Sequence, residues 1–432
     1  MKRLMLAIAL LLCAGMLCAS AASPAGEVAA ADFGVTADGG TPCAAALQKA
    51  IDSLPAGGGV VRLPAGVMLL EKTVTIPQRT TLLGEGASWE NTSSTFHVKH
   101  KDGPAFRMNS YSAVKGAAVY YPDNLTPEKM EKPDRYDPAF EIAGCNVSLE
   151  YINIDGAWVG VSSKYPEGSN AGQSLFSNIN GFCHHRGFRM TGALDVNRYE
   201  NIHFFPSRIA PLGDKAYAPH NLIAFEFGRQ DGGTFNACFV ICARGFFRQT
   251  LNPAPGVNES TLSLGYAFTD CWIEGVDFGF DFQGGMGFTI LGCNVLVNGG
   301  GTGIRVRPEV IGFNGVIKDT QIRGYGQPFT GIDHDYSRKY WGGFYTDKLT
   351  ISDCVIQDAA PAVRLGERAE RVWIKDSLLM GIAGSPAVEI AKGARFFYVT
   401  DNIFQQRGGV KPLSDLSETA DKLIEGNRIE KL

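Results

Sequence analysis

The sequence has no long run of charged residues, and only 19% of its 432 residues are Asp, Glu, Lys or Arg. Its formal net charge is −4, which argues against a nucleic-acid partner because such proteins usually carry a basic surface. Stretches rich in Leu, Glu and Lys, which would form helices, are scarce, whereas Gly is abundant at 52 residues. This balance favours a fold with many tight turns over a helical bundle.

Beyond its first residues, the sequence has no apolar stretch long enough to span a membrane. Near the start, two basic residues precede an apolar run from Leu4 to Leu17, and the small residues Ala19-Ser20-Ala21 follow. This order is typical of a cleaved secretory signal. We therefore predict a signal peptide over residues 1–21, a short linker over residues 22–31, and a secreted or periplasmic protein.

A short motif recurs along the rest of the chain: an apolar residue, any residue, then Asp, Asn or Gly, two further residues and a second apolar one. One copy reads Ile351-Ser352-Asp353-Cys354-Val355-Ile356. The turn residues lie about 27.5 residues apart on average, which is the period of a solenoid. The predicted turn residues are Tyr151, Asn178, Asn201, Asn236, Asp270, Gly292, Asp319, Asp353, Asp376, Asp401 and Gly426.

A second motif follows the first after about ten residues, with a small residue and then alternating apolar and polar ones, as in Gly187-Phe188-Arg189-Met190. Alternation at period two indicates short strands. One rung cannot bury its apolar side alone, so the rungs must stack. We predict an all-β fold, a right-handed parallel β-helix of ten or more rungs. Cys271, Cys293 and Cys354 each follow a turn residue, which predicts a stack of thiols in the core.

The N-terminal segment carries a further signature. Asp32-Phe33-Gly34 precedes a short predicted helix from Ala44 to Leu54, and the stretches 57–66 and 82–86 are rich in glycine. The segment resembles the start of the pectate-lyase-like superfamily, which includes rhamnogalacturonase-like and epimerase-like β-helices. The resemblance implies one β-helix domain over residues 32–432, an N-terminal helix that caps the solenoid, and a polysaccharide partner.

The second motif also resembles the strand that carries the paired aspartates of polygalacturonases. Asp277 matches the first aspartate of that pair, but Phe278 stands in place of the second. The Asn-Thr-Asp, Gly-His-Gly and Arg-Ile-Lys signatures of that family are absent from the sequence. These departures argue against polygalacturonase chemistry.

Residues that should point outward from the second strand form a ladder of mixed charge. Opposite charges on neighbouring strands contribute roughly 0.2–1 kcal/mol per pair, so such a ladder can be purely structural. We expect its interruptions, Gly160 and Phe247, to leave room and an aromatic platform for a sugar ring. The predicted ladder is Arg107, Glu141, Gly160, Arg189, Glu226, Phe247, Asp281, Arg305, Asp333, Arg364 and Glu389.

Insertions beside this strand point to a binding groove, because insertions in repeat proteins tend to line the functional face. They are predicted near residues 109–137, 206–220, 249–261 and 335–346. Arg186 and Arg244 are expected to share one rung position there. The candidate catalytic residues are Arg186, Glu226, Arg244, Asp277 and Asp281. The candidate substrate-binding residues are His185, Arg189, His220, Phe247 and Arg305.

Two chemistries fit these residues. β-Elimination needs a cation against a uronate carboxylate and a nearby base; arginines can supply both, while Asp277 or Asp281 orients an arginine or binds Ca²⁺. Hydrolysis needs two carboxylates about 5–9.5 Å apart, and Glu226 and Asp281 would lie about 9.6 Å apart at ~4.8 Å per rung. The sequence favours a lyase acting on an anionic polysaccharide with no required cofactor. A hydrolase and a non-catalytic carbohydrate binder stay open.

Overall fold

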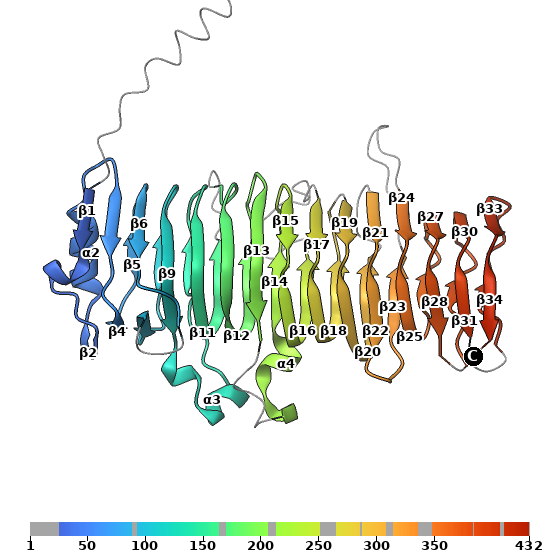
Figure 1. The fold of residues 1–432 in the computed structure, drawn as a ribbon, viewed down its shortest axis with the longest axis horizontal. Coiled ribbons are helices and arrows are strands. Elements are labelled where there is room, and N and C mark those ends of the chain that lie inside the picture. Colours follow the sequence, from blue (N-terminus) through green and yellow to red (C-terminus); the bar gives the residue numbers. More distant parts are fainter. Residues whose placement is uncertain are drawn as a thin grey trace, which may run out of the picture.

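The chain winds into a parallel β-helix whose long axis runs across Figure 1. This computed structural model confirms the predicted fold class. The predicted signal peptide, residues 1–21, lies outside the described part of the chain. The structure describes residues 26–88, 93–163, 170–205, 213–250, 265–285, 287–307, 314–335, 348–382, 384–406 and 410–431.

Successive rungs stack their strands into three parallel sheets, which we name the first, second and third sheet in the order in which the chain passes through them. The first sheet contains β1 (Gly26–Ala29), β3 (Gly59–Arg62), β6 (Thr80–Leu83), β15 (Gly233–Asn236), β17 (Tyr266–Thr269), β19 (Gly287–Leu291), β21 (Asn314–Lys318), β24 (Lys348–Ser352), β27 (Glu370–Lys375), β30 (Arg395–Thr400) and β33 (Lys422–Glu425). The second contains β2 (Asp38–Pro42), β4 (Gly66–Leu70), β7 (Ser94–Val98), β22 (Gln321–Gly324), β25 (Val355–Ala359), β28 (Leu378–Gly381), β31 (Ile403–Gln406) and β34 (Arg428–Lys431). The third contains β5 (Val74–Ile76), β8 (Phe106–Met108), β10 (Phe140–Ile142), β14 (Ile223–Phe227), β23 (Thr330–His334), β26 (Val363–Leu365), β29 (Val388–Ile390) and β32 (Leu413–Asp415).

Longer strands bend from one sheet into the next and so join the sheets into one framework. Those shared by the first and second sheets are β9 (Ala113–Tyr120) and β13 (Asn197–Phe204). Those shared by the second and third are β16 (Phe239–Gln249), β18 (Trp272–Phe282) and β20 (Asn294–Val306). Two strands pass through all three sheets, β11 (Ser148–Ser163) and β12 (Leu175–Met190).

A residue in the left-handed αL conformation makes the tight turn between the first and second sheets. Asn and Asp adopt this conformation more readily than other residues with a side chain. The side chains also link rungs, since Asn201 Nδ2 donates to Asn178 Oδ1 at 2.8 Å. The predicted turn motif is confirmed by φ values of 50–56° at Asn178, Asn201, Asp270, Asp319, Asp353, Asp376 and Asp401.

One copy of the motif lies one residue later than predicted. Ala237 takes the αL conformation with φ of 50°, whereas Asn236 is the last residue of β15. The preference of Asn for such turns made position 236 the natural prediction, but the rung is in register only with its turn at Ala237. Phe247, which follows on the same rung, therefore faces inward instead of outward.

The shift adds a fourth thiol to the predicted stack. Cys238 follows the turn in its rung, as Cys271, Cys293 and Cys354 do in theirs, and all four are buried. Burial raises the pKa of the Cys354 thiol to about 12. A thiol in such surroundings is poorly reactive, so the predicted role of these cysteines as small core residues holds.

Aromatic rings fill the core at the middle of the solenoid. The ring of Phe235 stacks against that of Tyr199 at a centroid distance of 4.5 Å and against that of Phe268 at 4.6 Å. Each ring comes from the first sheet of successive rungs, so the inward positions of neighbouring strands pack directly on one another.

At the N-terminal end, strand structure begins earlier than predicted. β1 starts at Gly26 and is followed by the 3-10 helix η1 (Ala30–Phe33), so residues 26–31 are part of the fold and not a linker. Helix α2 (Ala44–Asp52) lies at this end of the solenoid (Figure 1) and buries Leu47 and Ile51 in the core. The carboxylate of Glu71 accepts a hydrogen bond from Ala44 N at 3.1 Å and satisfies an amide of the first turn.

Two helical insertions protrude at the lower edge of Figure 1, where the chain passes from the second sheet to the third. One contains η2 (Pro122–Asn124) and α3 (Pro127–Glu131), and the other contains η3 (Gly213–Lys215) and α4 (Tyr217–Asn221). The insertion predicted over residues 109–137 is therefore partly wrong, because residues 113–120 form β9 and the excursion starts after them. The predicted insertions at 249–261 and 335–346 lie almost wholly outside the described residues.

His184 fastens the first insertion to the solenoid. Its buried ring donates from Nε2 to the backbone oxygen of Asn124 at 3.0 Å, and Asn124 Nδ2 donates to Gly156 O at 2.9 Å. Burial lowers the pKa of His184 to about 4. The ring is thus neutral where the contact forms.

We expect Phe235→Ala to lower the free energy of unfolding by about 3–5 kcal/mol, because it leaves a cavity between two stacked rings. Urea unfolding measures the change. Trp272→Ala, which truncates an aromatic side chain on the exposed face of β18, is the matched control and should cost under about 1 kcal/mol. Equal losses in the two variants would contradict the stacked core.

His184 should make stability depend on pH. Because its folded pKa of about 4 lies below an unfolded value of ~6.5, the unfolded chain takes up the proton first. The stabilisation is complete above about pH 6.5 and is lost progressively as pH falls toward 4. In His184→Gln, the unfolding free energy should fall less steeply over this window, as followed by urea unfolding at a series of pH values. Parallel curves for the two proteins would rule the role out.

Candidate functional site

The predicted charge ladder lies on the outer face of the third sheet. Strand register places Arg189 beside Glu226 and Asp281 beside Arg305, as predicted. Two positions differ from the prediction: Ser162 stands where Gly160 was expected, and Arg248 stands where Phe247 was expected. From β12 onward the ladder therefore alternates in sign without interruption, through Arg189, Glu226, Arg248, Asp281, Arg305, Asp333, Arg364 and Glu389.

Arg248 is the centre of this ladder. Its Nε donates to Asp281 Oδ2 at 3.2 Å, and its Nη1 lies 4.0 Å from Glu226 Oε1. The guanidinium also lies over the ring of Phe278, with 4.6 Å between Cζ and the ring centroid. The other oxygen of Asp281 accepts from Arg307 Nε at 3.3 Å. Arg248 thus neutralises one carboxylate on each of the two rungs beside its own. Arg307 forms a second ion pair with Asp281.

Arg186 connects the ladder to the second helical insertion. Its Nε donates to Glu226 Oε2 at 2.7 Å, and its Nη1 donates to the backbone oxygen of Asn221, at the end of α4, at 3.1 Å. Arg186 is 8% exposed, so these contacts replace its hydration. Its geometry is that of a residue that positions α4 and Glu226.

His185 belongs to an aromatic cluster between the two insertions. Its ring stacks on that of Trp158 at a centroid distance of 4.5 Å, and Trp158 also contacts the ring of Tyr217 on α4 at 5.5 Å. Arg135 covers Trp158 at 5.4 Å. Burial, together with the nearby Arg186 charge, lowers the pKa of His185 to about 4. A neutral His185 fits its contact with the cation, since its Nδ1 lies 3.2 Å from Arg186 Nη1.

Two predictions about this face are wrong. Phe247 is fully buried in the core and offers no platform to a sugar. Arg244 does not share the position of Arg186, which pairs through Ile223 with Gly245. Arg244 is instead exposed, in register with Asp277 of the next rung, whose Oδ1 accepts from Asn298 at 3.2 Å.

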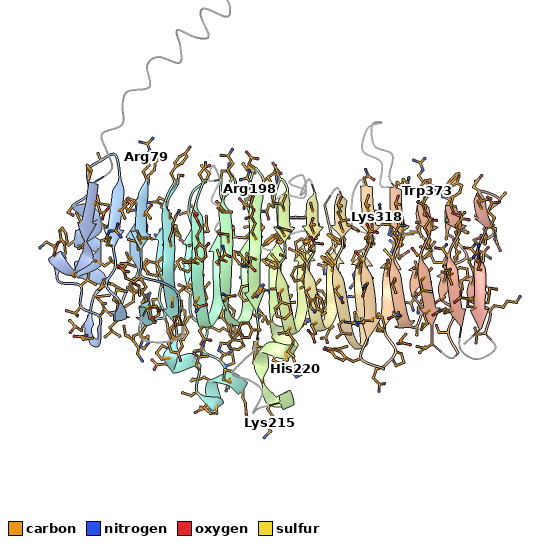
Figure 2. All side chains as sticks on the ribbon, in the orientation of Figure 1. Arg79, Arg198, Lys215, His220, Lys318 and Trp373 are labelled. Carbon is orange, nitrogen blue, oxygen red and sulfur yellow. The ribbon has the colours of Figure 1, made fainter. Side chains whose placement is uncertain are left out.

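His220 lies apart from the ladder. It is exposed on α4 at the lower edge of the molecule, close to Lys215 in Figure 2. The predicted role of His220 in substrate binding stays a prediction.

The pair proposed for hydrolysis, Glu226 and Asp281, does lie two rungs apart. Arg248 occupies the space between them and contacts both. Carboxylates that act in hydrolysis have to face the substrate, whereas both of these face the guanidinium of Arg248. The arrangement therefore does not suit two-carboxylate hydrolysis.

The surroundings of Asp281 do not suit Ca²⁺ either. Its two oxygens already accept from Arg248, Arg307 and Gln283, and calcium requires several oxygen ligands free of such cations. Within the described residues, no group of three or more His, Cys, Asp or Glu side chains could hold a metal ion. In the same part of the chain, no helix is long and apolar enough to cross a membrane.

Burial also acts on the arginines themselves. It lowers the pKa of Arg305, and the neighbouring Arg307 charge acts in the same direction. Burial likewise lowers the pKa of Arg248. Arg305 Nη2 donates to Thr302 Oγ1 at 2.8 Å, whereas Arg248 is engaged by carboxylates. Arg305 is thus a half-buried cation of weakened basicity that donates to a hydroxyl group, on the outer face of the third sheet.

Sequence reasoning missed Arg248, Arg307 and Trp158. Arg248 directly follows Phe247, so placing the αL turn at Ala237 would have found it. Arg307 lies two residues beyond Arg305, on the same face of an extended strand. Trp158 gives no periodic signal, because it lies within a shift of strand register between Ala157 and Val159.

Comparisons with known proteins agree with this description. Residues 28–119 match the family described as rhamnogalacturonase A/epimerase, pectate lyase-like, which confirms the resemblance seen in the sequence. A search of curated protein sequences gave no match.

Solved structures share the fold at low sequence identity. The N-terminal fragment of gene product 12 of bacteriophage Phi29 is 12% identical, with a TM-score of 0.52 over 93% of this chain and 80% of that one. The Dettilon tailspike protein gp208 is 12% identical, with a TM-score of 0.50 over 87% and 68% of the two chains. An exopolygalacturonase from Thermotoga maritima is 11% identical, with a TM-score of 0.48 over 88% and 91%.

We expect Arg248→Ala to lower the free energy of unfolding by about 3–5 kcal/mol, because it leaves buried carboxylates without their shared partner. Arg364→Ala is the matched control, since Arg364 is 41% exposed in the same ladder, and it should cost under about 1 kcal/mol. Urea unfolding compares the two. Similar small losses would show that the central ion pairs contribute no more than surface ones.

Proposed function

We propose that this pectate-lyase-like β-helix protein is exported, binds a uronate-containing polysaccharide along the outer face of its third sheet, and cleaves it by β-elimination. The observation that carries the proposal is the depth of the ladder charges. The side chain of Asp281 is 1% exposed, so its carboxylate lies beneath the surface, whereas the side chain of Arg307 is 40% exposed. A ligand laid on this face meets guanidinium groups first.

The exposed arginines supply recognition of an anionic chain. Arg189 and Arg244 are exposed, and Arg305 is half-buried between them and the C-terminal rungs. Guanidinium groups bind carboxylates in paired, charge-assisted hydrogen bonds. The protein as a whole is acidic, so this local excess of cations would select an anionic polymer by position and not by net charge.

The match to a rhamnogalacturonase and epimerase family over residues 28–119 supports a polysaccharide as the ligand. The Phi29 and Dettilon proteins share the fold at 12% identity. These likenesses concern the scaffold, and the reaction type is inferred from the ladder alone.

Arg305 is the residue we assign as the base. In β-elimination a base takes the proton from the carbon beside the uronate carboxylate, and the electron pair of that C–H bond forms a carbon–carbon double bond. The bond from the next carbon to the glycosidic oxygen breaks, and the departing oxygen takes up a proton from water. Arg307 would neutralise the carboxylate and so stabilise the negative charge that develops there.

The lowered pKa of Arg305 sets the expected pH dependence. A base must be unprotonated to act, so the rate rises with pH until the pKa of Arg305 is reached. We therefore expect kcat/KM to increase steadily from neutral into alkaline pH. A bell with its maximum in the acidic range would point to a carboxylate base instead.

The decisive experiment incubates the protein with polygalacturonate, rhamnogalacturonan and alginate. It follows both the ultraviolet absorbance of unsaturated ends and the release of reducing ends. A lyase produces both signals together. Reducing ends without new absorbance would indicate hydrolysis, and binding without either signal would indicate a non-catalytic protein; both results would overturn the proposal.

Variants locate the chemistry on the ladder. Arg305→Ala should lower kcat by about 10²–10⁴-fold, the usual contribution of a general base. Arg364→Ala, two rungs further along the same face, should leave kcat nearly unchanged. Arg244→Ala should mainly raise KM, because Arg244 lies at the edge of the ladder beside the insertions. Equal losses at Arg305 and Arg364 would show that the base lies elsewhere.

A further inference from the structure

We propose that the outer face of the second sheet holds a separate binding site for one neutral, hydroxyl-rich sugar ring. It lies over β7, β9 and β11, near the N-terminal end of the solenoid (Figure 1), on a different sheet from the charge ladder. The site is a pocket of about 150 Å³. Cavities of that volume hold a six-membered ring.

The pocket is built from two rows of outward residues on three adjacent strands. In the first row Ala118 lies between Thr95 and Asn153. In the second row Tyr120 lies between His97 and Asp155. Ala118 carries only a methyl group, so the surface is hollow at the centre of the first row. The segment Ala87–Ser88 forms a further wall: Asn153 Nδ2 donates to Ala87 O at 3.0 Å, and Ser88 lines the pocket.

The buried polar groups of this pocket include hydrogen-bond acceptors. Asn153 is 3% exposed, and its Oδ1 has no hydrogen-bond partner among the described residues. An acceptor buried without a donor is costly, by about 1–3 kcal/mol. Asp155, 2% exposed in the next position, is also an acceptor. A ligand that brings a hydroxyl group can donate to Asn153 Oδ1, whereas a ligand with its own carboxylate meets the negative charge of Asp155.

The opposite wall is aromatic. The rings of His97 and Tyr120 stack at a centroid distance of 5.2 Å and an angle of 30°. Burial, helped by the nearby Lys99 charge, lowers the pKa of His97, which keeps that ring uncharged near neutral pH. Flat rings from β7 and β9 and acceptor groups from β11 suit the two kinds of surface on a sugar, one of C–H groups and one of hydroxyls.

This site differs from the charge ladder in what it would accept. The ladder presents guanidinium groups and suits uronates, whereas the pocket presents an amide oxygen and a carboxylate. The pocket would therefore hold a neutral unit, such as a side-chain or terminal sugar of a branched polymer. Its existence does not depend on the reaction assigned to the ladder, because the test measures binding alone.

The experiment titrates the full-length protein with D-glucose, D-galactose, L-rhamnose and D-galacturonate, using ligand-observed saturation-transfer NMR and calorimetry. At least one neutral sugar should bind, and Ala118→Leu, which fills the hollow, should weaken that binding by about tenfold or more. Ala267→Leu places the same side chain on the outer face of the first sheet and should bind as the wild type does. Failure of every neutral sugar to bind, or unchanged binding by Ala118→Leu, would overturn the proposal.

A measurement on the wild type keeps the test independent of how well Ala118→Leu folds. Hydrogen–deuterium exchange with and without the bound sugar should show new protection in β7, β9 and β11. Protection confined to β14, β16 and β18 would place the sugar on the charge ladder and would also overturn the proposal.

Discussion

Backbone hydrogen bonds between stacked rungs hold this molecule together, and from β11 to β34 each rung turns between the first and second sheets at a residue of positive φ. The turn fixes which side chains of the following strands face inward. Where Asp or Asn occupies it, the side chain tolerates the unusual backbone, as at Asn178 and Asp270. The aromatic stack inside and the charge ladder outside both inherit their alignment from this one position.

The ladder on the third sheet shows how the same alignment serves electrostatics. Because the same outward position recurs at every rung, strand pairing alone brings charges of opposite sign close together. Where the ladder is partly buried, around Arg248, these pairs are shielded from water and interact strongly. Where it is exposed, around Arg364, they resemble ordinary surface pairs. The same alternation of charge therefore forms strong, partly buried ion pairs at the centre of the ladder and ordinary surface ion pairs at its C-terminal end.

Periodicity allowed the fold to be predicted from the sequence, together with most of the ladder. The buried cysteines, the turn residues and the pairing of Asp281 with Arg305 all follow from repeat spacing. The failure at Phe247 has a simple cause, because Asn236 competes with Ala237 for the turn and local preference favours the wrong one. In a strand, a slip of one residue exchanges the two faces. A buried Phe247 was thus taken for a surface residue, and Arg248 was overlooked.

Contacts that join different parts of the chain were beyond such reasoning. The stacking of His185 on Trp158 and the bond from Arg186 to the end of α4 depend on the paths of two insertions. Insertions interrupt the repeat, so their residues have no equivalent position in other rungs from which their contacts could be predicted. Contacts such as these cannot be predicted from the repeat, and the position of the insertions leaves the binding groove on the third sheet as a prediction.

The hollow above Ala118 illustrates a wider property of this architecture. The main chain of a β-helix is held by its own ladder of hydrogen bonds, and an outward side chain that forms no buried ion pair contributes little to it. Enlarging or shrinking one such residue therefore changes the shape of the surface without disturbing the strands below it. A scaffold of this kind can gain or lose a ligand in a single mutational step, which makes its faces open to rapid evolutionary change while its core stays constrained.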